Sequence, residues 1–317
     1  MGAASYSFVT RDFQVNDLGY NQRVDQHGGW SWLQYRRQLE SGSLREFRIN
    51  QNNWVFHQLS SGERVGLGGN ANINGRLRSY WNFYAGAGFD AAAYDPYEVE
   101  TGGHLYLRPT TPFFFGGFSS DSRKNVMISL NANGNRDVTG GSNFSVSPSV
   151  DLRLGSQGEL SLGSSISGGH DQLEWAYTED NGQPVFGRRN YLQLDTWTRG
   201  SVTFSDKLSL QFFGQLLAIE GVYGQYQALL GDGTLGSYGP SCGGECPDPN
   251  FNVQYFNTNA ILRWEYRPGS TLYAVWTQSR ELSQTEVSAS LGEEVASNFR
   301  HGANNSFLLK LNYRWGS

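Results

Sequence analysis

The sequence is poor in several features that identify common classes of protein. It has no run of about 18 apolar residues, which excludes a membrane-spanning helix. Lysine and arginine number 24 against 29 aspartate and glutamate residues, and no basic run occurs, which argues against a nucleic-acid partner. The mean hydropathy of −0.50 does not exclude a membrane β-barrel, because the side chains that face a barrel lumen are polar.

Glycine and aromatic residues are abundant instead, with 40 Gly, 19 Phe, 17 Tyr and 9 Trp among 317 residues. Apolar and polar side chains alternate along many segments, as expected of a β-strand, whose successive side chains point to opposite faces. In residues 143–154, for example, Phe144, Val146 and Val150 alternate with serine and aspartate. No segment has the spacing of a long helix, so the pattern predicts an all-β chain.

Fourteen alternating segments are predicted to be strands. Many are as long as the 9–11 residues that a tilted strand needs to cross a bilayer, whereas strands of soluble sheets have about five or six residues. Aromatic residues such as Trp81, Trp175, Trp264 and Trp315 lie near segment ends, where a membrane barrel carries its aromatic girdles. The predicted strands are residues 5–16, 28–39, 44–59, 64–74, 77–89, 112–120, 124–134, 143–154, 159–177, 188–204, 207–219, 251–266, 271–280 and 304–315.

The connections between these segments alternate in length. Turn-forming segments such as 40–43 and 267–270 alternate with mostly longer ones at about 90–111, 135–142, 178–187, 220–250 and 281–303. Outer-membrane barrels have an even number of strands, short periplasmic turns and long extracellular loops. We therefore expect residues 1–317 to form one domain, a closed antiparallel transmembrane β-barrel of about 14 strands. A large soluble barrel or sandwich is the alternative fold.

Charged side chains fall on the polar face of the predicted strands. In a membrane barrel they must point into the lumen, because a charge that faces hydrocarbon is costly. There they either form a structural ion-pair network or set the charge preference of a pore; Arg263 and Glu265 share one strand face and could pair with charges on neighbouring strands. The predicted lumen charges are Arg64, Arg78, Asp151, Arg153, Asp195, Arg199, Arg263, Glu265, Lys310 and Arg314.

Cys242 and Cys246 lie in the segment CGGEC, within a Gly- and Pro-rich stretch. In an oxidising compartment such a pair closes a small disulfide ring. Free thiols are one alternative, and a metal site with Glu245 and Asp248 is another, although no histidine is nearby. We predict the disulfide, and expect neither a metal nor another cofactor.

The sequence contains no recognisable catalytic motif. Its histidines lack the HExxH spacing of a metalloprotease, and no GxSxG nucleophile elbow is present. His170, Asp171 and Glu174 lie near one loop, which leaves an outer-membrane hydrolase as an alternative to a protein without enzymatic activity. The five histidines are His27, His57, His104, His170 and His301.

Several stretches resemble one family of bacterial proteins. They are LRWEYRPGSTL (residues 262–272) with VWTQ (275–278), FQVNDLGY (13–20) and SRK (122–124). They are similar to the barrel region, a domain of unknown function, that follows carbohydrate-binding family nine-like domains in those proteins. The resemblance implies a barrel in the outer membrane of Gram-negative bacteria and no established catalytic residues. The N-terminal sugar-binding-like domain is absent from this chain, so a sugar-binding role is not expected to follow.

The sequence thus predicts an outer-membrane barrel that acts as a pore or passive transporter for small solutes. Its expected partners are the lipid bilayer and a small solute, with no nucleic acid. The alternative is a membrane anchor or assembly platform for a periplasmic or surface protein, with a plugged lumen.

Overall fold

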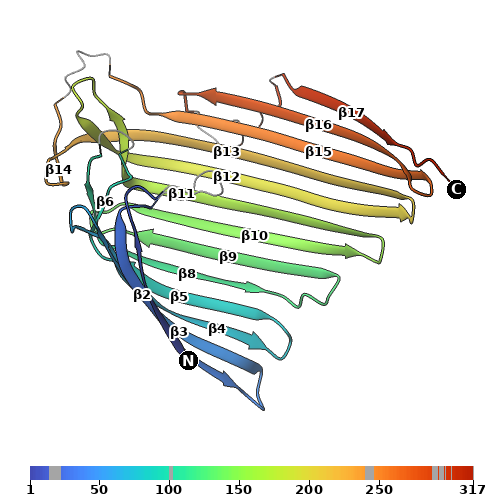
Figure 1. Ribbon diagram of the computed structural model, residues 1–317, viewed down its shortest axis with the longest axis horizontal. Helices are drawn as coiled ribbons and strands as arrows, with labels where there is room; N and C mark the ends of the chain where they lie inside the picture. The colour runs from blue at the N-terminus through green and yellow to red at the C-terminus, as the bar shows by residue number, and fades with distance from the viewer. Residues whose placement is uncertain are drawn as a thin grey trace.

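Most of the chain forms one curved antiparallel sheet, shown in Figure 1 from a computed structural model. The structure describes residues 1–13, 23–99, 103–239, 246–287 and 302–316, together with residues 292, 296 and 298–300. The main sheet has 15 strands, of which all but β14 follow one another in chain order along a single path. Each strand of this path is antiparallel to the next, so the sheet is built from consecutive hairpins.

The strands of this path are β1 (Gly2–Val9), β2 (Gln26–Gln38), β3 (Leu44–Gln58), β4 (Arg64–Leu77), β5 (Asn82–Asp90), β8 (Thr111–Ser119), β9 (Val126–Arg136), β10 (Ser142–Leu154), β11 (Gly158–Thr178), β12 (Pro184–Ser205), β13 (Leu208–Leu229), β15 (Phe251–Arg267), β16 (Ser270–Gln284) and β17 (Asn304–Asn312). The short strand β14 (Leu235–Ser237) pairs with β13. β6 (Ala93–Asp95) and β7 (Tyr106–Arg108) form a separate two-stranded sheet.

The prediction of an all-β antiparallel chain is confirmed, and each predicted strand has a counterpart in the path. The strands β6, β7 and β14 were not predicted, because three residues are too few to show an alternation. The described residues contain no helix with the length and hydropathy of a membrane span.

The sheet is open, which differs from the closed barrel predicted from the sequence. Within the described residues, β1 pairs only with β2 and β17 only with β16, so each leaves one backbone edge without a partner strand there. The reason is that alternation and turn lengths specify pairing between consecutive strands, whereas closure requires the first and last strands to meet. Nothing local in the sequence encodes that contact.

Two faces of the sheet follow from the strand register, because residues directly opposite each other in antiparallel strands share a face. Gln34, Asn50 and Asn72 are opposite one another on β2, β3 and β4, and define what we call the polar face. One position along, Tyr35, Ile49 and Ile73 define the apolar face.

The apolar face leaves large hydrophobic side chains exposed along the whole sheet. Leu33 and Phe114 each expose 59% of their surface and Phe144 exposes 49%. Further exposed residues of this face are Tyr35, Ile49, Ile73, Phe89, Val126, Ile128, Val146, Leu162, Ile166, Phe204, Leu262, Trp264, Phe307, Leu309 and Leu311. A soluble protein rarely exposes a contiguous apolar surface of this extent.

Strand length varies strongly across the sheet. β5 and β8 have 9 residues each, whereas β11 has 21 and β12 and β13 have 22 each. At a rise of about 3.3 Å per residue, the longest strands extend to about 70 Å. The short hairpin turns gather at one end of the sheet, here called the turn end, and the longer connections with β6 and β14 at the other, the loop end (Figure 1).

Close backbone approach in the sheet makes Gly28 of β2 a sensitive position. A Cβ atom there would collide with the carbonyl oxygen of Val55 and lie 2.7 Å from the Cα atom of Phe56. Both are backbone atoms of β3, so a Gly28→Ala substitution is expected to lower the free energy of unfolding by about 1–3 kcal/mol. Denaturant unfolding followed by tryptophan fluorescence measures the change.

Gly224 of β13 is the matched control, since no atom outside its neighbours lies within 4 Å of the position of its Cβ. Gly224→Ala is expected to leave stability nearly unchanged. Equal stabilities of the two variants would contradict the close packing of β2 on β3.

Candidate functional site

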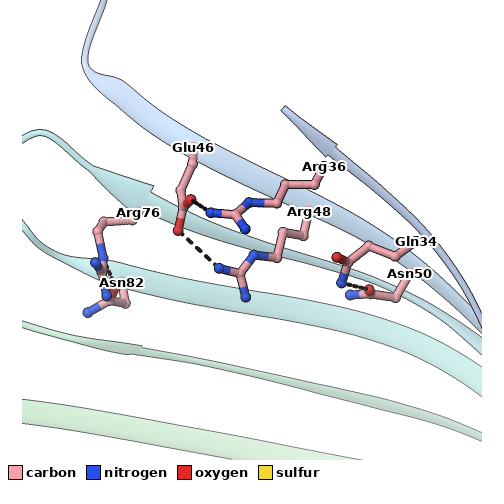
Figure 2. A network of polar contacts seen from close by, with 7 residues as sticks. All are labelled: Gln34, Arg36, Glu46, Arg48, Asn50, Arg76 and Asn82. Atoms are coloured by element: carbon pink, nitrogen blue, oxygen red, sulfur yellow. Dashed lines mark hydrogen bonds and ion pairs between the residues drawn. The ribbon is translucent and has the colours of Figure 1, made fainter. Parts of the chain in front are cut away.

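The polar face carries a continuous row of hydrogen-bonded amides near β2, β3 and β4. Gln34 Nε2 donates to Asn50 Oδ1 at 2.8 Å, a contact drawn in Figure 2, and Asn50 Nδ2 donates to Asn72 Oδ1 at 2.8 Å. Asn72 donates to Asn70 at 3.0 Å, and Asn52 to the same Asn70 oxygen at 2.9 Å. These amides satisfy one another without needing a ligand, and still present polar atoms to the space above the sheet.

Toward the turn end, the amide row gives way to an arginine-rich cluster. Glu46 accepts hydrogen bonds from Arg36 at 2.8 Å and from Arg48 at 3.2 Å, as Figure 2 shows. Arg76 Nε donates to Asn82 Oδ1 at 2.8 Å on the neighbouring strands. Two guanidinium groups bond the Glu46 carboxylate, and a third, that of Arg76, lies opposite Glu46 in the register, so this part of the polar face is positively charged.

Serine side chains continue the polar face across β9, β10 and β11. Hydroxyl contacts of 2.6–3.0 Å join three cross-strand pairs, Ser129 with Ser149, Ser147 with Ser165, and Ser145 with Ser167. A surface of hydroxyls and amides binds water and small polar solutes and is unsuited to hydrocarbon.

Most of the predicted lumen charges lie on the polar face within strands. Asp151 of β10 accepts a hydrogen bond from Ser161 at 2.5 Å, and the register places Arg199 of β12 in the same row. Asp195 accepts from Gln215 Nε2 at 3.1 Å. Lys310 of β17 lies in the row of Arg263, with Tyr273 between them.

Arg263 and Glu265 pair with each other along β15, at 3.1 Å, rather than across strands. Such a pair is of the kind expected if these charges have a structural role. Whether any of these charges selects a solute remains a prediction.

Four predicted charges lie at the ends of strands rather than in the middle of the polar face. Arg64 donates to the carbonyl of Ala92 at 2.7 Å at the loop end. Arg78 follows β4 and donates to the carbonyls of Leu39 and Gly42 in the neighbouring turn, at 2.7 and 2.8 Å. The two other residues are at the turn end: Arg153 lies opposite Glu159, and Arg314 follows β17.

The predicted disulfide stays a prediction. Cys242 lies outside the described residues, as does Glu245, while Cys246 lies in the connection that leads to β15. Among the described residues, no three His, Cys, Asp or Glu side chains are arranged to hold a metal ion. His170 Nε2 lies 3.3 Å from Asp171 Oδ2 in an exposed pair.

A long connection that the sequence analysis treated only as a loop crosses the loop end of the polar face. We call residues 91–110 the strap; of these, residues 100–102 lie outside the described part of the chain. At one side, the hydroxyl of Tyr97 bonds the backbone of Val24, at 2.9 Å from the amide and 2.8 Å from the carbonyl. At the other, Leu107 donates its backbone N–H to Gly233 at 2.8 Å. The strap thus joins the β1–β2 connection to the β13–β14 turn.

Apolar side chains anchor the strap on the long strands. Val99 and Tyr106 of the strap are buried against Phe186 of β12 and Leu229 of β13. The ring centroids of Tyr106 and Phe186 lie 4.5 Å apart. In the described part of the chain, this cluster is a small dry core beside an otherwise polar face.

A cavity of about 430 Å³ lies beneath the strap. Its walls include Trp54 and Asp90 of the polar face and Tyr106 and Arg108 of the strap. Acidic groups outnumber basic ones in its lining, which contains Asp90, Glu98, Asp137 and Glu174 against Arg23 and Arg108. The cavity therefore favours a small polar or cationic solute over an anion.

Glu98 of the strap is the most perturbed carboxyl of this cavity. Burial and the neighbouring carboxylate of Glu174 raise the pKa of Glu98 from its ordinary 4.5 to about 7, while a hydrogen bond from the backbone N–H of Trp175, at 3.1 Å, opposes the shift. Glu174 is itself held by Arg189 at 3.1 Å. Glu98 was not among the residues predicted from the sequence; the available signal was the apolar residues Val99, Tyr106 and Leu107 within a long connection.

The raised pKa of Glu98 predicts a pH-dependent stability. The folded chain binds this proton more tightly than the unfolded chain, so the stabilisation is complete below about pH 4.5 and is lost as the pH rises through about 7. A Glu98→Gln variant, which keeps the acceptor for Trp175, is expected to be more stable than the parent by about 2 kcal/mol at pH 8 and similar to it at pH 4.5.

Urea unfolding at the two pH values measures both differences. Glu63→Gln, at an exposed glutamate between β3 and β4, serves as the control and is expected to leave the stability unchanged at both pH values. A Glu98→Gln variant less stable than the parent at pH 8 would show that ionised Glu98 stabilises the strap.

Comparison with known proteins places the whole sheet in one family. A search of curated proteins finds no match to the chain. The model of a domain of unknown function, DUF5916, matches residues 2–314. Since the match covers nearly the whole chain and every strand of the path, the protein belongs to the DUF5916 family.

Proposed function

We propose that the chain is a transmembrane β-barrel of a bacterial outer membrane that lets small polar solutes pass. The observation that carries the proposal is the exposure of large hydrophobic side chains along one whole face of the sheet, opposite a face of amides, hydroxyls and charges. Water suits only the second face. Contact of the apolar face with hydrocarbon and of the polar face with water would suit the side chains of both faces.

The proposal requires the sheet to close in the membrane, and the directions of its two end strands are compatible with closure. Lipid cannot satisfy backbone hydrogen bonds, so a sheet in a bilayer must have no free edge. β1 runs from the turn end to the loop end and β17 runs back, so a ladder between them would be antiparallel like every other pair of the path. Such pairing would enclose the polar face as a lumen.

The strap and its cavity would then form the narrowest part of the lumen at the loop end. A solute would pass the acidic cavity beneath the strap before it reaches the arginine cluster at the turn end. Because the acidic cavity is the narrowest part, it would favour small polar or cationic solutes over anions.

A second function is favoured by the apolar core under the strap. Val99 and Tyr106 are packed against Phe186 and Leu229 as residues of a permanent plug would be. A barrel plugged in this way would serve as a membrane anchor or assembly platform for a periplasmic or surface protein. A hydrolase has no comparable support, since His170 forms only an exposed pair with Asp171.

Single-channel recording on protein refolded into a planar bilayer separates these functions. A pore is expected to produce discrete conductance steps with a preference for cations, because of the acidic cavity. Glu98→Gln should reduce that preference. Persistent silence, in protein shown to be inserted, would overturn the pore and favour the anchor.

Lipid contact predicts unequal costs of arginine on the two faces of β11. Ile166 lies on the apolar face and Ser165 on the polar face, opposite Asp195. Ile166→Arg is expected to lower the free energy of unfolding by about 2–4 kcal/mol near the bilayer midplane, and Ser165→Arg by less than about 1 kcal/mol. Urea unfolding in lipid vesicles measures both. Similar costs would contradict the assignment of the faces.

A further inference from the structure

The apolar face has a groove over β2, β3, β4 and β5. Its volume is about 740 Å³. Small residues of β4 and β5, Gly69, Ala71 and Ala87, form its floor, and Leu33, Ile49 and Phe89 form its walls. The continuous cover of bulky side chains is thus interrupted in the middle of these strands.

Two amide side chains lie in this groove, on the face that otherwise carries hydrocarbon. The register places Gln51 opposite Leu33 and Ala71, and Asn53 opposite Ser31 and Gly69. Both amides are exposed, and along β3 they stand between Ile49 and Val55. They are therefore far from both ends of the strand.

The two amides differ in how they are satisfied. Asn53 Nδ2 donates to Ser31 Oγ at 3.3 Å. No hydrogen bond joins the side chain of Gln51 to the described part of the chain. In a bilayer, an exposed amide without a partner costs several kcal/mol, and acyl chains offer it neither a donor nor an acceptor.

A second groove on the same face shows that polar residues here need not lack partners. It has a volume of about 550 Å³ and lies over β10, β11, β12, β13 and β15. Ser164 and Thr196 bond each other at 3.0 Å, and Thr258 donates to the carbonyl of Phe213 at 2.8 Å. Acyl chains can cover these hydroxyls without loss, so Ser164, Thr196 and Thr258 do not call for a protein partner.

A second copy of the chain can supply the hydrogen-bond partner that the Gln51 amide lacks. An amide carries both donors and an acceptor, so it is complementary to another amide. A two-fold axis through the groove would bring each Gln51 to the Gln51 of the other copy, since such an interface uses the same surface on both subunits. The small residues of the floor would let the two sheets approach closely, as small residues do in membrane interfaces.

We infer that the groove over β2–β5 is the surface through which two copies of the chain associate in the membrane, with their Gln51 amides hydrogen-bonded to each other. The inference rests on the proposed membrane location of the apolar face. It adds a partner, a second copy of the same chain, and the residue through which the copies recognise each other.

Cysteine cross-linking in lipid vesicles tests the inference. A Gln51→Cys variant, oxidised after reconstitution, is expected to give a disulfide-linked dimer on non-reducing gels. Thr196→Cys, an exposed position of the second groove, is the matched control and is expected to stay monomeric. The parent chain with its own two cysteines is the blank. Equal cross-linking of the two variants, or none for Gln51→Cys, would overturn the inference.

A second variant measures the contribution of the amide. Gln51→Leu fits the apolar face and is expected to lower the dimer association constant, measured by fluorescence energy transfer between labelled copies in vesicles, roughly tenfold. An unchanged constant would place the contact elsewhere, for example at the free edges of β1 and β17, and would overturn the inference.

Flotation of the same vesicles separates failure of the inference from failure of the proposed function. Protein that floats with the lipid but does not dimerise contradicts only the inference. Protein that stays in solution contradicts the membrane location itself.

Discussion

Hydrogen bonding between neighbouring antiparallel strands determines the face on which every side chain of the sheet lies. A shift of one residue in any pair would exchange the faces of a whole strand. One register therefore produces both rows of side chains. It aligns Gln34, Asn50 and Asn72 on the polar face and Tyr35, Ile49 and Ile73 on the apolar face. The two rows lie on opposite faces of a single sheet. The polar row therefore requires a polar environment and the apolar row an apolar one.

The strap changes the character of one end of this two-faced sheet. It brings Tyr106 onto Phe186 and so creates a dry core beside a face of amides and hydroxyls. The same burial holds Glu98 beside Glu174, and the two carboxylates repel each other there. Apolar anchoring and the perturbed acid are thus consequences of one contact.

Local periodicity predicted the strands, because alternation is a property of a few consecutive residues. It predicted β10 and β11 nearly to their ends, but extended β1 to residue 16, whereas this strand ends at Val9. Properties that need distant segments to meet were out of reach. Glu98 resembles any loop glutamate until the strap lies on β12, and the free edges of β1 and β17 have no local signature. The predicted lumen charges were assigned to a face by the same alternation, yet the carboxylate that pairs with Arg263 proved to be on its own strand.

The unequal lengths of the strands have a mechanical consequence. A tilted strand needs 9–11 residues to span hydrocarbon, a number that β5 and β8 barely reach, while β11, β12 and β13 have about twice as many. In a bilayer, the extra residues of β11, β12 and β13 would project beyond the lipid headgroups, and only on the side of the sheet that these strands form. If the apolar face lies in a bilayer as proposed, molecules that approach along the membrane would meet the projecting strands from one direction and a low edge of the sheet from the other.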